Sequence, residues 1–186
     1  AMRELSLNVM DVAQNSITAG ASLITIRVEE DRQKGEMVIS IEDNGKGMSE
    51  EQVRQVIDPF YTTRTTRKVG LGVPLFKMEA EMTGGDFSIQ SRVGEGTLVT
   101  ARFCTDHVDM IPLGDIDNII LLLITCNPDR DFWFVHQVDG RQAELDTRQL
   151  REALGGEVPL NEPDVVQWIR EYLQEQTDLL QGGDAT

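Results

Sequence analysis

The sequence contains few of the features that stabilise secreted or membrane-spanning proteins. It has 2 cysteines, Cys104 and Cys126, which are too few for a disulfide framework. Its longest purely aliphatic run, residues 119–124, is far shorter than the ~20 residues that cross a bilayer. We recognise no signal-peptide pattern. We therefore expect a cytoplasmic protein with reduced thiols and no membrane contact.

Positive charge is also scarce. Lysine and arginine total 17 against 32 acidic residues, so the formal charge is −15. Polynucleotides and anionic membranes need a basic surface, and this balance therefore excludes both as main partners. A small nucleotide stays possible, because it requires only a local pocket. Apolar residues make up 40% of the 186-residue chain, enough for a hydrophobic core.

Lysine is absent from residues 107–186. That segment has 5 basic and 16 acidic residues, a net charge of −11, whereas residues 1–106 have 12 and 16, a net of −4. The stretch between them contains Pro112 and Gly114 and is the natural junction. We therefore expect two units, 1–106 and 107–186, with different roles.

The periodicity of the first unit indicates alternating helices and strands. Helical spacing and capping residues predict helices over 3–19, 49–56 and 74–82. Alternating and β-branched runs predict strands over 23–29, 37–41, 87–93 and 97–103. This order predicts an α/β fold, a two-layer sandwich in which helices cover one face of a mixed sheet.

The second unit is predicted to be a small α+β appendage of ββαα type. We expect strands over 119–125 and 132–138, and helices over 147–154 and 162–180. Its aromatic residues are interpreted as core. The two cysteines of the chain, Cys104 in the first unit and Cys126 in the second, are interpreted as buried free thiols. Its carboxylates are interpreted as solvated faces, with contact to a basic protein partner as the alternative.

Two polar side chains share a face of the first helix. Asp11 and Asn15 are four residues apart. A carboxylate and an amide in this arrangement suit Mg²⁺, which takes hard oxygen ligands and keeps several waters. The alternative is an ordinary solvated helix face.

An acidic residue and two glycines follow the second predicted strand, at Asp43, Gly45 and Gly47, just before Met48. A carboxylate at a strand end can accept a hydrogen bond from an exocyclic amine. Glycines close to it let the backbone approach a flat ring. The alternative is a surface turn.

Two further signals follow in the chain. Phe60 opens a polar stretch with Arg64, which suits phosphate oxygens. The stretch ends at a helix start that favours anions, formed by Gly70, Leu71 and Gly72. Thr97 follows a Gly-Glu-Gly turn. The alternatives are a loop-to-helix junction and a simple hairpin.

Together these motifs resemble the GHKL, or Bergerat-fold, ATP-binding family of gyrases, histidine kinases, MutL-type proteins and anti-sigma kinases, over residues 3–105. The resemblance implies that Asn15 binds Mg²⁺ and that Asp43 recognises the adenine amino group, assisted by Thr97. It implies nucleotide contacts for the remaining motif residues, which are Gly45, Gly47, Met48, Phe60, Arg64, Gly70, Leu71 and Gly72.

The sequence departs from the family at Asp11, where many relatives carry a glutamate that activates water. Aspartate is one methylene shorter, so we expect slow hydrolysis, with Asp11 acting through a water or only orienting the site. We see no dimerisation segment with a phosphoacceptor histidine before residue 3. We interpret His107 as a linker residue and His136 as a strand residue, and do not expect self-contained autophosphorylation.

Three functions are compatible with these residues. The first is a regulator that binds ATP and Mg²⁺ and phosphorylates or switches a protein partner. The second is a slow ATPase that uses Asp11, and the third is a non-catalytic ATP sensor. In the first and third, the acidic second unit contacts the partner; the oligomeric state stays open.

Overall fold

The computed structural model describes residues 3–60 and 72–182. Within them lie six helices and six strands. The helices are α1 (Leu5–Thr18), α2 (Glu50–Val56), α4 (Gly72–Met82), α5 (Ile116–Cys126), α6 (Thr147–Ala153) and α7 (Pro163–Leu180). The strands are β1 (Leu23–Asp31), β2 (Glu36–Asp43), β3 (Asp86–Arg92), β4 (Gly96–Cys104), β5 (Asp131–Val138) and β6 (Arg141–Asp146). None of the helices in the described part of the chain has the length and apolar character needed to cross a membrane.

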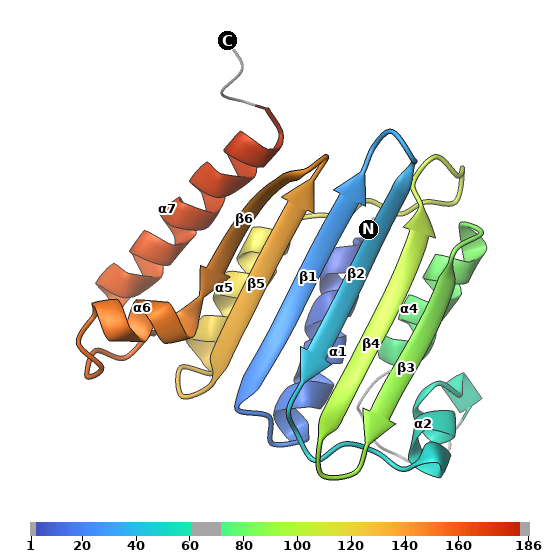
Figure 1. The fold of residues 1–186 in the computed structure, drawn as a ribbon, viewed down its shortest axis with the longest axis horizontal. Coiled ribbons are helices and arrows are strands. Elements are labelled where there is room, and N and C mark those ends of the chain that lie inside the picture. Colours follow the sequence, from blue (N-terminus) through green and yellow to red (C-terminus); the bar gives the residue numbers. More distant parts are fainter. Residues whose placement is uncertain (1–2, 61–71, 183–186) are drawn as a thin grey trace.

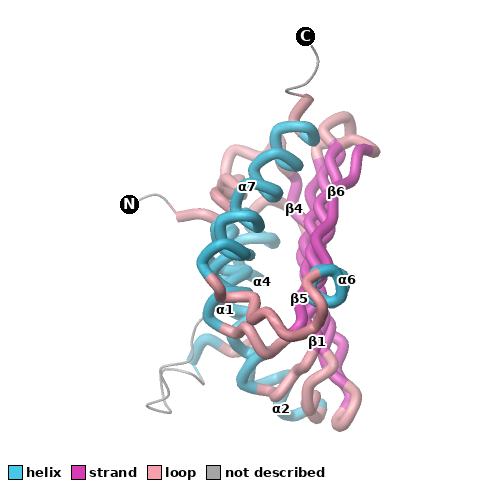
Figure 2. Tube along the Cα trace, turned by 90° about the vertical axis from the view of Figure 1, so that its left-hand side faces the viewer, coloured by secondary structure: helices cyan, strands magenta, loops and turns pink. Residues whose placement is uncertain are grey.

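All six strands form one mixed sheet, in the order β3-β4-β2-β1-β5-β6 (Figure 1). The pair β1 and β5 is parallel, and the other neighbours are antiparallel. Figure 2 shows α1, α4 and α7 in a layer on one side of this sheet. The predicted α/β sandwich with a mixed sheet is therefore confirmed.

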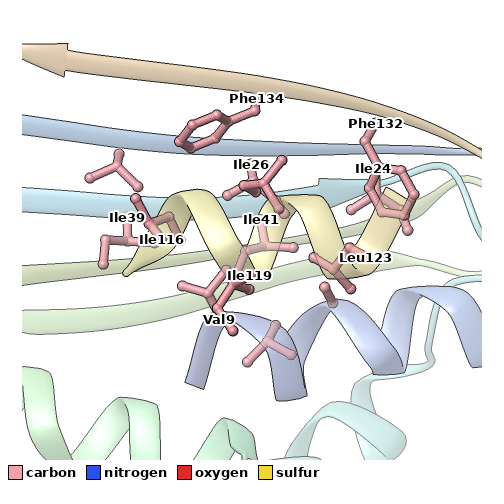
Figure 3. Packing of buried hydrophobic residues seen from close by; sticks show 14 of the residues in the cluster. Val9, Ile24, Ile26, Ile39, Ile41, Ile116, Ile119, Leu123, Phe132 and Phe134 are labelled. Carbon is pink, nitrogen blue, oxygen red and sulfur yellow. The ribbon is translucent and has the colours of Figure 1, made fainter. Parts of the chain in front are cut away.

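The core lies between the sheet and the helix layer. Alternate residues of β1 and β2 point toward the helices, and those shown in Figure 3 are Ile24, Ile26, Ile39 and Ile41, each at most 1% exposed. Helix α1 buries Val9 against them, and α5 covers the neighbouring part of the sheet. Burial of one stripe of each helix and one face of each strand follows directly from the 3.6- and 2-residue periods.

The strand predicted over residues 119–125 is wrong, because these residues form most of α5. A short apolar run is compatible with a buried strand or a buried helix. The buried positions separate the two. Five of them follow helical spacing, namely Ile116, Ile119, Ile120, Leu123 and Ile124, and Leu121 is buried as well. The side chain of Asp115 caps the helix by accepting from the Asn118 N–H at 3.1 Å.

The second predicted strand is present as β5, and it is followed by a strand, β6, that we did not predict. β5 lies against β1, the outer strand of the first four, with Leu23 opposite Asp131 and Glu30 opposite Val138. The boundary near residue 106 stays a prediction. In the fold, the residues on its two sides share one sheet and one core.

The connection before α5 also holds the start of α1. The carbonyls of Pro112 and Leu113 accept the N–H groups of Leu5 and Ser6, at 2.9 and 2.8 Å. The first N–H groups of a helix have no acceptor within the helix and require partners from elsewhere in the chain. The C-terminal part therefore contributes to the placement of the helix that carries Asp11 and Asn15.

Candidate functional site

Asp43, the last residue of β2, is held by two hydrogen bonds. The Ser16 hydroxyl of α1 donates to Oδ2 at 2.6 Å, and the Gly45 N–H donates to Oδ1 at 2.8 Å. Each carboxylate oxygen has two lone pairs, so both keep the capacity to accept another bond. The carboxylate is thus fixed in orientation and still able to receive a donor from a ligand.

Thr97 lies directly opposite Asp43 on the neighbouring strand β4. Its hydroxyl oxygen is 2.7 Å from the Ser91 hydroxyl of β3, which also receives the Met48 N–H at 2.8 Å. Ser91 donates to the Gly96 carbonyl at 3.1 Å. Whichever hydroxyl donates in the Ser91–Thr97 bond, the Thr97 oxygen keeps at least one acceptor lone pair beside Asp43.

Glycines permit the close packing around Asp43. Gly47 has φ +71°, and a Cβ there would overlap the Arg92 carbonyl. Gly96 has φ +131°, and a Cβ there would overlap the Asp43 carbonyl. Larger residues at either position would push the loop after β2 away from the β3–β4 hairpin. We assigned Gly96 only a turn role from the sequence, and the structure shows this additional contact.

The predicted Asp11 and Asn15 pair lies on one face of α1, next to the start of α4. A Cβ on Gly72, the first residue of α4, would come within 2.7 Å of the Asp11 Cβ, so the two helices touch here. The Asn15 amide makes no side-chain hydrogen bond to the residues that the structure describes. Asp11 is therefore close to the N-terminal turn of α4, and the Asn15 amide, one turn further along α1, is available for a ligand.

The Asp11 carboxyl keeps exposed surface, yet desolvation by its surroundings raises its pKa above the ordinary value, while the Arg3 charge partly opposes this. A raised pKa makes the carboxylate a stronger base. Arg3 also pairs with Glu79 of α4, which is 4% exposed, at 2.7 Å. The N-terminal segment is thereby tied to the helix that begins at Gly72.

Some predicted contact residues cannot be placed. Arg64, Gly70 and Leu71 lie outside the described residues. Phe60 is described and is 70% exposed, and its N–H donates to the Asp58 carboxylate at 2.9 Å. The structure thus brings together Asp11 with Gly72, and Asp43 with Thr97 and the glycines.

Ser16 is the site residue that the sequence did not reveal. It follows Asn15 directly, and it is 3% exposed, facing β2. A serine inside a helix has no distinctive pattern. The signal was its position on the side of the helix that also carries Val9, Val12 and Ala13, where a buried hydroxyl requires a partner.

The described residues fit ATP with Mg²⁺. A strand-end carboxylate, a hydroxyl and close-packed glycine backbone suit an adenine ring, which has an amine, ring acceptors and flat faces. The Asn15 amide oxygen suits Mg²⁺, which needs few protein ligands when phosphates supply others. A separate hollow of about 620 Å³ has carboxylates of Glu29, Glu30 and Asp31 in its wall, which would repel a triphosphate.

The fold is an α/β sandwich, and the chemistry of this arrangement is compatible with a nucleotide. The family model HATPase_c, described as "Histidine kinase-, DNA gyrase B-, and HSP90-like ATPase", matches residues 1–107. The chain belongs to this family, and membership implies that it binds ATP. The resemblance inferred from the motifs is therefore confirmed, while the roles of individual residues stay predictions.

Two curated relatives are sensor proteins. Sensor protein DegM of Bacillus sp. (strain B21-2) is 33% identical over 91 residues, covering 49% of this chain and 24% of DegM. Sensor protein SrrB of Staphylococcus aureus (strain NCTC 8325 / PS 47) is 34% identical over 101 residues, covering 52% of this chain and 17% of SrrB. The chain thus spans a quarter or less of these relatives.

One solved structure shares the fold at low sequence identity, and a second gives a weaker match. The N-terminal domain of a DNA repair protein superposes with a TM-score of 0.53 and 15% identity, covering 77% of this chain and 52% of that one. The MutL ATPase domain of Aquifex aeolicus, complexed with ADP, superposes with a TM-score of 0.49 and 16% identity. That match covers 81% of this chain and 68% of the MutL chain. The first match supports the fold alone.

Proposed function

We propose that this protein is a regulator that binds ATP with Mg²⁺ and acts on a protein partner, by phosphotransfer or by a nucleotide-dependent change of shape. The observation that carries this proposal is the arrangement around Asp43. An oriented carboxylate with free lone pairs lies beside a hydroxyl and close-packed glycines, at the end of the interior strand β2 and next to α1.

In this proposal the residues act as follows. Asp43 accepts the adenine amino group, and Thr97 supports the same edge of the ring. The Asn15 amide oxygen holds Mg²⁺, and the N–H groups at the start of α4 favour phosphate charge. Arg64 is assigned to the phosphates from the sequence alone. When bound, ATP supplies the transferable phosphoryl group, and Mg²⁺ neutralises its charge.

The phosphate acceptor is assigned to the partner. The chain has 2 histidines. His136 is 3% exposed on β5, and burial lowers its pKa to about 4. His107 follows β4, and its Nδ1 accepts the Asp109 N–H at 3.0 Å. His136 is enclosed in a strand and His107 lies in a connection between elements. These are the strand and linker positions expected from the sequence.

The acidic C-terminal part is proposed to bind a basic surface of this partner. Residues 107–186 carry a net charge of −11. Complementary charge would steer association and make its rate fall with added salt. A fall in the association rate with salt would support this assignment, and a salt-independent rate would contradict it.

A slow ATPase is the second candidate, and the position of Asp11 favours it. The carboxyl flanks the start of α4, where phosphates are proposed to lie, and its raised pKa suits a base. Steady-state phosphate release that disappears in Asp11→Ala, with ATP binding retained, would support hydrolysis. Undiminished release in this variant would exclude Asp11 as the base.

The assignment of the pocket is tested by calorimetric titration of Mg-ATP into Asp43→Ala. We expect binding to be lost, because the carboxylate that orients the adenine is removed. Glu42→Ala is the matched control, since it removes an exposed carboxylate one residue earlier on the same strand. Normal affinity in Asp43→Ala would refute the assignment. Transfer of labelled phosphate to proteins added in trans then separates a kinase from a sensor.

A further inference from the structure

Residues 19–22, which connect α1 to β1, are hydrogen-bonded to the loop that follows Asp43. The Ala19 carbonyl accepts the Lys46 N–H at 2.9 Å. The Asn44 amide oxygen accepts the N–H groups of Ser22 and Leu23 at 2.9 and 3.0 Å. A shift of this connection therefore moves the loop on which the candidate adenine contacts depend.

The C-terminal part is hydrogen-bonded to the same connection. The Arg130 guanidinium donates to the Ala21 carbonyl, and the Asp131 N–H donates to the Ser22 carbonyl at 2.8 Å. These bonds come from residues 128–131, which we name the 128–131 turn. Residues 19–22 are thus bonded both to the candidate nucleotide loop and to the turn before β5.

Arg151 of α6 holds the 128–131 turn in place. Its Nε donates to the Asp131 carboxylate at 2.8 Å, and its Nη2 donates to the carbonyls of Pro128 and Arg130, each at 2.7 Å. The side chain is 28% exposed. A partly buried guanidinium with three acceptors is a strong, directional anchor, because charged hydrogen bonds are stronger than neutral ones.

We propose that Arg151 is a positioning residue for the nucleotide site, through which the C-terminal part sets the affinity for ATP. Arg151 fixes the turn, the turn fixes residues 19–22, and these fix the loop that follows Asp43. Binding coupling is reciprocal, so ATP also stabilises the turn and α6. The inference rests on the proposed nucleotide contacts of residues 43–48 and assigns their regulation to the acidic part of the chain.

The test compares two arginines of α6. Arg151→Ala is expected to weaken Mg-ATP binding about tenfold, within the range of typical coupling between sites. Arg148→Ala is the matched control, because its hydrogen bonds go to Asp146 and none goes to the described residues of the turn. Arg151→Lys keeps the charge and loses the planar fork, so it restores part of the affinity.

A positioning role of Arg151 is distinguished from a purely structural one by measuring the Mg-ATP affinity well below the melting temperature. Circular dichroism confirms that each variant is folded. Unchanged affinity in folded Arg151→Ala would overturn the inference. If Arg151→Ala does not fold, hydrogen exchange of the wild type decides. Saturating Mg-ATP must slow exchange in residues 128–132 and 147–153, and unchanged exchange there overturns the inference.

Failure of this inference is distinguishable from failure of the proposed function. Lost binding in Asp43→Ala together with normal binding in Arg151→Ala would refute the coupling alone. Normal binding in Asp43→Ala would refute the nucleotide site itself, and the coupling with it.

Discussion

Asp117 is a half-buried carboxyl whose charge opposes folding. It lies in the first turn of α5 and faces α7, where its Oδ2 accepts the Thr177 hydroxyl at 2.5 Å. Its Oδ1 is buried without a hydrogen-bond partner among the described residues. Burial raises the pKa of Asp117 from 3.8 to about 6, the Thr177 bond opposes this, and repulsion from Asp115 and Asp178 adds to it.

The sign of the pH effect follows from this raised pKa. Between pH 3.8 and about 6 the folded protein keeps the Asp117 proton more often than the unfolded chain does. The free energy of unfolding therefore falls as pH rises through this window, and the loss is complete above it. The full interval corresponds to about 3 kcal/mol, and solvent screening of the partly exposed carboxyl reduces this to ~1–2 kcal/mol.

Asp117→Asn removes the charge and keeps an acceptor for Thr177. The substitution also gives up a favourable charge at a helix N-terminus, about 0.3–1 kcal/mol. We expect a net gain of ~1 kcal/mol at pH 7.5, or a melting temperature higher by about 2–4 °C. The gain should shrink at pH 5, where the folded protein keeps the proton.

Urea unfolding at both pH values, followed by circular dichroism, measures this difference. Glu175→Gln is the control, because it removes an exposed charge from the neighbouring helix α7 that is not among the charges acting on Asp117, and it should alter stability little. A variant that is destabilised equally at pH 5 and pH 7.5 would show that the Asp117 charge carries no penalty in the fold, and would refute the reasoning.

Three further predictions concern the site and the core. Ser16→Ala removes the bond to Asp43, so we expect Mg-ATP affinity to fall about tenfold by calorimetry, the value of a charged hydrogen bond; unchanged affinity would show that Ser16 does not orient the carboxylate. Gly47→Ala places a Cβ against the Arg92 carbonyl at φ +71°, and should abolish Mg-ATP binding in a calorimetric titration of the folded protein; normal binding would show that the loop can move. Leu123→Ala empties a fully buried position in α5 and should cost ~2–5 kcal/mol in urea unfolding, whereas a strand-edge or surface position would lose under 1 kcal/mol.

The sequence predicted the part of the fold that depends on local patterns. The strand predicted over 37–41 is β2, which continues two residues further, to Asp43. The helix predicted over 49–56 is α2, which begins after Ser49, and the side chains of Ser49 and Gln52 form its capping box. Such signals act within a few residues, so periodicity and capping chemistry reveal them. Ser16 was missed because its role depends on a residue 27 positions away, at the end of another element.

The C-terminal part could not be predicted in the same way, because its structure depends on β1. Thr25 of β1 is 7% exposed, and Val135 of β5 is 2% exposed, although neither points toward the helix layer. Across the parallel pair, the Arg27 guanidinium lies 5.0 Å from the centre of the Trp133 ring. Burial on the open face of the sheet therefore arises only when the two strands meet, about 100 residues apart in sequence. A strand at an edge requires a partner or protection. The acidic part satisfies this requirement for β1, and the same contact brings the 128–131 turn against residues 19–22. The segment that completes the sheet is thus also the one placed to influence the candidate nucleotide loop, residues 43–48.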